Sequence, residues 1–140
     1  MERIVVGVDG SQSSREALQW AVDEARRRNA SVEAVYAWHE PFVAGYDYLG
    51  ERDIGGIEEK ERQILDAAIA DVDATGIPPI ERSIVAGGAA GALVEAAKGA
   101  DLLVVGSRGR GGFSGLLLGS VSQQVAHHAS CPVVIIPPAS

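Results

Sequence analysis

The chain has 140 residues and a mass of 14.6 kDa, a size that fits one domain. Apolar residues make up 46% of it and charged residues 22%, which is typical of a globular protein and excludes a disordered one. The formal net charge of −7 disfavours nucleic acid and anionic membranes as partners, because their binders usually present a basic face. Glycine is unusually frequent, with 17 residues, and six of them lie between Gly106 and Gly119.

The sequence also predicts a cytoplasmic protein. The single Cys131 cannot form an intramolecular disulfide, which fits a reducing compartment. The apolar run near the start, Ile4–Val8, is too short for a signal peptide, and no stretch approaches the ~18 apolar residues of a membrane span.

Five short apolar segments are predicted to be strands, because most are rich in β-branched residues and are bounded by Gly, Pro or Asp. They are Ile4–Val8, Val32–Trp38, Ile80–Val85, Leu102–Val105 and Val133–Ile136. The first, fourth and fifth are almost continuously apolar, as expected of strands covered on both faces. The third alternates between apolar and polar residues, which predicts an edge strand.

Four helical patterns separate these strands. They cover Ala17–Ala25, Ile57–Val72, about 89–98, and a segment that begins near Ser120 and runs to Ala129. Ser13 and Glu16 form a candidate capping box before the first helix, and Gly76 and Gly99 are expected to stop the second and third. The alternation predicts an α/β fold: a single doubly wound, Rossmann-like domain over residues 1–140 with helices on both faces of a five-stranded parallel sheet. The simplest strand order is 3-2-1-4-5.

One long connection, residues 40–56, follows the second strand. It carries aromatic residues, and loops of this length in compact domains are usually functional or disordered. Two interpretations stay open, a mobile lid and a plain surface excursion.

A ligand site is predicted where the first and fourth strands end, because doubly wound sheets bind ligands where the strand order reverses. Asp9 and Gly10 follow the first strand, and a glycine-rich segment that leads to Gly119 and Ser120 follows the fourth. A glycine loop that enters a helix N-terminus favours anions, since free N–H groups and the helix dipole point at the ligand. Gly106 and Gly109 would let the backbone approach that ligand without a Cβ in the way.

The roles of several side chains in this region have two possible interpretations. Arg108 and Arg110 are phosphate ligands or solvated loop residues. Asp9 is a ligand of ribose hydroxyls or of Mg²⁺, or simply part of a turn into the helix. The chain has neither a Walker phosphate loop nor the Gly-x-Gly-x-x-Gly of a standard dinucleotide site.

The spacing Gly106-x2-Gly109-x9-Gly119-Ser120 resembles the ATP-binding signature of the universal stress protein family. The resemblance extends to residues 4–11 and 102–109 and to Cys131–Val134, so it covers essentially the whole chain. It implies an adenine-nucleotide-hydrolase-like fold and an ATP-binding member of the family. One departure is that no proline follows the glycine after the third strand, which affects the adenine side of the site.

The resemblance also implies which residues bind the nucleotide. Asp9 would lie near the ribose, the phosphates or a Mg²⁺ ion, with Gly10 adjacent, and backbone near Ala37 would contact adenine. The phosphates would be wrapped by a loop and a turn that comprise Gly106, Ser107, Arg108, Gly109, Arg110, Gly111, Gly112, Gly119, Ser120 and Val121.

The remaining candidate residues point to ordinary structural roles. His127 and His128 are adjacent, so they face different sides of a helix and do not form a metal pair. Cys131 before Pro132 is expected to be a small packed residue and not a nucleophile.

The last strand, Val133–Ile136, is uncharged and predicted to be an edge, so we expect it to pair with its copy in a homodimer. The family's dimers through the last strand agree.

These observations favour an ATP-binding regulatory or stress-response module whose nucleotide state is read by protein partners that the sequence does not identify. An alternative is a slow ATPase or a hydrolase acting at the α-phosphate, with Asp9 and Mg²⁺ orienting a water. A third hypothesis is a vestigial crevice in a dimeric interaction scaffold.

Overall fold

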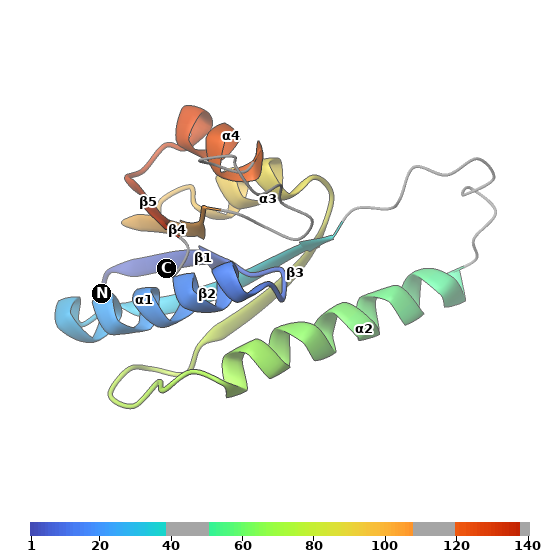
Figure 1. Ribbon diagram of the computed structural model, residues 1–140, viewed down its shortest axis with the longest axis horizontal. Helices are drawn as coiled ribbons and strands as arrows, with labels where there is room; N and C mark the ends of the chain where they lie inside the picture. Colours follow the sequence, from blue (N-terminus) through green and yellow to red (C-terminus); the bar gives the residue numbers. More distant parts are fainter. Residues whose placement is uncertain (39–50, 108–119, 138–140) are drawn as a thin grey trace.

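The computed structural model describes residues 1–38, 51–107 and 120–137 of the chain (Figure 1). Strands and helices alternate strictly within these ranges. The elements are β1 (Arg3–Gly7), α1 (Gln12–Arg28), β2 (Ser31–Trp38), α2 (Glu51–Ala70), β3 (Glu81–Ala86), α3 (Ala89–Ala96), β4 (Leu102–Gly106), α4 (Ser120–His128) and β5 (Val133–Ile136).

All five strands form one parallel sheet in the order β3-β2-β1-β4-β5, so the predicted fold class and strand order are confirmed. From β1 the chain builds outward to β2 and β3, then returns to the other side of β1 to build β4 and β5. The order therefore reverses between β1 and β4, which are paired from Ile4 with Leu102 to Val6 with Val104. This is the place where doubly wound sheets leave a crevice.

Helices cover the two faces of the sheet in pairs. Figure 1 shows α1 and α2 on one face and α3 and α4 on the other. Alternate residues of β1 supply the two resulting cores: Ile4 and Val6 pack with α1 and α2, whereas Val5 packs with α3 and α4. Such double coverage is why β1 and β4 read as continuous apolar runs.

The N-cap of helix α1 lies two residues before Ser13, so the predicted capping box of Ser13 and Glu16 is wrong. Its N-cap is Ser11, whose hydroxyl accepts a hydrogen bond from the backbone N–H of Ser14 at 3.1 Å. The helix ends at Asn29, which adopts a left-handed conformation with φ of 60°.

Helix α2 is displaced toward the N-terminus relative to the prediction. It begins at Glu51, so residues 51–56 of the predicted long connection are helical, and it ends at Ala70, well before Gly76. A hydrogen-bonded turn accounts for the early end. The Asp73 carboxylate accepts hydrogen bonds from the backbone N–H and the hydroxyl of Thr75, and Arg26 donates to the Asp73 and Thr75 carbonyls, which together hold a turn. Gly76 has a φ of 89° within that turn, while Gly99 follows α3 with a φ of 78° as expected.

Both edges of the sheet are strands that the sequence marked as edges. β3 carries the predicted alternation, and its neighbour among the described strands is β2. β5 lies beside β4 at the opposite edge and is half-buried along its length. In the part of the chain that the structure describes, no helix is long and apolar enough to cross a membrane.

Candidate functional site

The turn that follows β1 is held in place by its own side chains. The Asp9 carboxylate accepts a hydrogen bond from the Ser11 backbone N–H at 2.9 Å, and the Asp9 N–H donates to the Ser14 hydroxyl at 3.2 Å. Ser14 in turn donates from its hydroxyl to the Ser11 carbonyl at 3.0 Å. Gly10, between them, has a φ of 84°, which a residue with a Cβ rarely adopts. The first turn of α1 is thereby fixed at the crevice with Asp9 at its entrance.

The end of β4 lies directly against this first turn. A Cβ at Gly106 would come within 2.8 Å of the Ser13 carbonyl oxygen and 2.9 Å of its carbonyl carbon, and would overlap the Ser13 hydroxyl. The sequence suggested that this glycine is needed for the approach of a ligand. The structure gives a different reason for the missing side chain, since α1 occupies the space that a Cβ would fill.

Ser107, the next residue, joins three elements at the end of β4. Its backbone N–H donates to the Ile136 carbonyl of β5 at 2.9 Å, and its carbonyl accepts from the Ser122 hydroxyl of α4 at 3.3 Å. Both serines are buried, with 2% of their surface exposed. Among the residues that the structure describes, the buried Ser107 hydroxyl has no hydrogen-bond partner. Buried polar groups are nearly always hydrogen-bonded, so this hydroxyl marks a place where a polar group of a ligand would be stabilised.

The remaining predicted site residues are distributed around the same end of the sheet. Ala37 lies next to the last residue of β2, level with Val85 of β3. Ser120 is the first residue of α4, and Val121 packs into the core formed with α3 and α4. The glycine loop proper lies outside the described residues; it includes the predicted ligands Arg108, Gly109, Arg110, Gly111, Gly112 and Gly119.

Of the predicted site residues that the structure describes, Asp9 is the one that carries a carboxylate. Among the described residues, no group of three or more His, Cys, Asp or Glu side chains could hold a metal ion. A single carboxylate is compatible with Mg²⁺, which typically binds one or two carboxylates and takes its other ligands from phosphates and water. The residues fit a magnesium ion that arrives with a nucleotide better than a resident metal site.

The two histidines and the cysteine have the expected surroundings. His127 and His128 are both exposed on the last turn of α4, with ring centroids 6.3 Å apart. Cys131 is partly buried against the core between the sheet and α3 and α4, and burial raises the pKa of its thiol. A raised pKa keeps the sulfur protonated at neutral pH, which disfavours a nucleophilic role.

Sequence reasoning missed the roles that three serines have at the site. Ser13 contacts Gly106, Ser14 holds the Asp9 turn, and Ser122 holds Ser107. The run of serines at 11, 13 and 14 is a visible signal for a helix start that hydrogen-bonds to its own turn. The link from Ser122 to Ser107 has no comparable local signal.

Comparisons with known proteins agree with this geometry. The profile of the universal stress protein family matches residues 1–137. Universal stress protein Rv2623 of Mycobacterium tuberculosis is 38% identical over 133 residues, which cover 94% of this chain and 44% of that protein. The chain therefore spans less than half the length of this curated relative.

Two solved structures extend the comparison. A universal stress protein crystallised in complex with cAMP is 34% identical, with 96% of this chain and 95% of that chain covered and a TM-score of 0.62. The universal stress protein of Archaeoglobus fulgidus in complex with dAMP is 26% identical, with 97% and 98% covered and a TM-score of 0.69. The profile match over nearly the whole length decides the assignment: the chain belongs to the universal stress protein family.

Proposed function

We propose that this chain binds an adenine nucleotide, ATP foremost, in the crevice between the ends of β1 and β4, and acts as a nucleotide-dependent regulatory module. The observation that carries the proposal is the convergence, at the reversal of strand order, of the fixed Asp9–Gly10 turn with the buried Ser107 hydroxyl, which has no hydrogen-bond partner among the described residues. Two relatives with structures in complex with cAMP and dAMP support an adenine nucleotide as the ligand class.

In this proposal each part of the crevice has a role. The backbone near Ala37 contacts adenine at the end of β2, and Asp9 accepts ribose hydroxyls or coordinates a Mg²⁺ ion that bridges to the phosphates. Gly106, Ser107, the loop of Arg108–Gly112 and the Gly119–Val121 turn surround the phosphates. The N-terminus of α4 adds its dipole and free N–H groups.

The proposed module is a homodimer formed through β5. The strand Val133–Ile136 is an uncharged edge, and such edges invite pairing unless they are covered. A two-fold pair of β5 strands would join two sheets into one. Light scattering at micromolar concentration is expected to give the mass of two chains, and a single-chain mass would contradict this assembly.

Equilibrium dialysis with labelled ATP tests the nucleotide proposal. The wild-type chain is expected to retain ATP, and Gly109→Trp is expected to lose it because the indole would fill the space of the phosphates. Lys98→Trp provides a control, since it places the same indole side chain at an exposed position just beyond the end of α3, at the amino end of the sheet. Equal binding by all three proteins, or no binding by the wild type, would contradict the proposal.

The same assay distinguishes a module from an enzyme. Retention of ATP in a fixed ratio to protein supports a regulatory module that changes state with occupancy. Sustained release of ADP or AMP would instead favour the hydrolase alternative, in which Asp9 and Mg²⁺ orient a water.

A further inference from the structure

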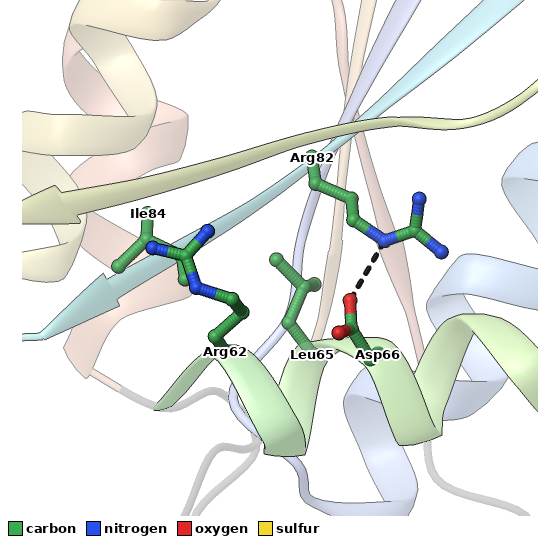
Figure 2. A pocket seen from close by; sticks show the side chains of 5 residues that line it. All are labelled: Arg62, Leu65, Asp66, Arg82 and Ile84. Atoms are coloured by element: carbon green, nitrogen blue, oxygen red, sulfur yellow. Dashed lines mark ion pairs between the residues drawn. The ribbon is translucent and has the colours of Figure 1, made fainter. Parts of the chain in front are cut away.

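A hollow lies away from the crevice, between α2 and the edge strand β3. Its volume is about 460 Å³, and it is lined by Arg62, Leu65 and Asp66 of α2 and by Arg82 and Ile84 of β3. Figure 2 shows Leu65 between the two arginines, with Asp66 beside Arg82. Its apolar part is the partly buried Ile84, which packs against the same core as the fully buried Leu65.

The hollow adjoins the outer edge of β3, beside which no other strand lies in the part of the chain that the structure describes. In the described residues β3 pairs with β2 alone, so its other edge presents backbone N–H and C=O groups along Glu81–Ala86. Unpaired edges of this kind are templates for an extended segment of another chain. Because side chains alternate along a strand, a segment added beside β3 would direct every second side chain toward α2 and the hollow.

The charges at the hollow select among such segments. Arg82 is about half exposed and forms an ion pair from Nε to the Asp66 carboxylate at 2.8 Å, whereas no hydrogen bond joins its two terminal nitrogens to any residue that the structure describes. Arg62 lies on the other side of Leu65 from Arg82, and its Nε is 3.7 Å from the Glu59 carboxylate of the same helix. The lining residues that the structure describes carry two positive charges and one negative charge, in a chain whose net charge is −7.

From these observations we propose that β3 and the adjacent hollow form a docking groove for an extended segment of a partner protein that carries an acidic side chain opposite Arg82. The carboxylate binds the terminal nitrogens of Arg82, as opposite charges on neighbouring strands favour pairing. A residue two positions away on the docked strand then lies level with Ile84, and an apolar side chain there fills the hollow over Leu65. A basic residue opposite Arg82 is rejected by like charge. The groove is separate from the nucleotide crevice and does not depend on it.

A short peptide that reads the same in both directions tests the groove without assuming strand polarity. The probe is acetyl-Thr-Val-Thr-Glu-Thr-Val-Thr-amide, with a glutamate flanked two residues away on each side by valine. Titrated into ¹⁵N-labelled protein, it is expected to shift the amide resonances of residues 81–86 and 62–66. The lysine version of the peptide is expected to bind about five- to tenfold more weakly.

Charge reversal separates docking from loss of fold. Arg82→Glu is expected to reverse the preference, so that the lysine peptide binds more tightly than the glutamate peptide; an unfolded variant could not do this. Arg27→Glu, a reversal on the exposed side of α1, is expected to leave both affinities unchanged. The proposal is overturned if neither peptide shifts residues 81–86, if the shifts map to β5 instead, or if Arg82→Glu does not invert the preference.

Discussion

Replacement of Gly106 by alanine tests the contact that fixes the first turn of α1 over the end of β4. The new Cβ would lie 2.8 Å and 2.9 Å from the carbonyl oxygen and carbon of Ser13. Carbon atoms pack best at about 3.5–4.0 Å, so the Ser13 backbone must retreat by roughly 0.6 Å or more. Because the obstacle is main chain, no side-chain rotation relieves it.

The expected cost is that of an overpacked core, about 1–3 kcal/mol in the free energy of unfolding. For a domain of this size that corresponds to a fall in the melting temperature of about 3–10 °C. Adding Ser13→Ala removes the overlap with the hydroxyl but not with the carbonyl, so the double variant should recover only part of the loss.

Thermal and urea unfolding followed by circular dichroism measure this effect. Gly91→Ala is the matched control, because a Cβ at Gly91 of α3 meets nothing within 4 Å and alanine favours helix by roughly 0.5 kcal/mol. The same chemical change is thus expected to destabilise the protein at one position and to stabilise it at the other. Equal effects at the two positions, or a Gly106→Ala protein as stable as the wild type, would refute the packing argument.

Two further predictions concern α2 and the turn after it. Leu65→Ala removes a fully buried side chain from the core under α2. We expect urea titrations to show that the free energy of unfolding falls by about 2–5 kcal/mol. A loss below about 1 kcal/mol would mean that Leu65 does not anchor α2 to the core. The hydroxyl and the N–H of Thr75 lower the pKa of the Asp73 carboxyl, so its stabilising effect is present above the ordinary carboxyl pKa and is lost as the pH falls below about 4. The difference in melting temperature between wild type and Asp73→Ala should therefore be steady from pH 6 to about pH 4 and shrink as the pH falls further, and a difference that stays constant at lower pH would contradict this role.

Much of the fold follows from the apolar pattern alone. β1 and β4 are continuously apolar because alternate residues enter different cores, as Val5 and Val6 do, and that pattern correctly predicted strands covered on both faces. The alternation of β3 predicted an edge for the complementary reason, since one of its faces carries Glu81 and Ser83. The strand order was predicted as the simplest one for five parallel strands joined by helices, and the structure confirms it.

Helix ends were predicted less well because they depend on contacts between distant residues. Several serines at the start of α1 can cap a helix, and the hydrogen bond to Ser14 selects Ser11. The end of α2 depends on Arg26, which belongs to another helix and donates to the turn that contains Asp73. The local sequence therefore determines neither the N-cap of α1 nor the last residue of α2.

The candidate site was likewise predicted only in part. The convergence of Asp9 and the end of β4 followed from topology, whereas the reason for Gly106 did not, because Ser13 approaches it only in the folded chain. The buried hydroxyl of Ser107 also emerges only from packing, through its neighbours Ile136 and Ser122. The order of the strands thus predicted where the crevice lies, whereas contacts between distant residues determine which groups line it.

Native mass spectrometry of the freshly purified protein tests the proposed nucleotide site most directly. It reports the number of chains and the mass of any bound molecule in one spectrum. The account predicts two chains, each with the added mass of one adenine nucleotide, and loss of that mass in Gly109→Trp but not in Lys98→Trp. Chains that carry no added mass, and that acquire none when ATP and Mg²⁺ are supplied, would contradict it.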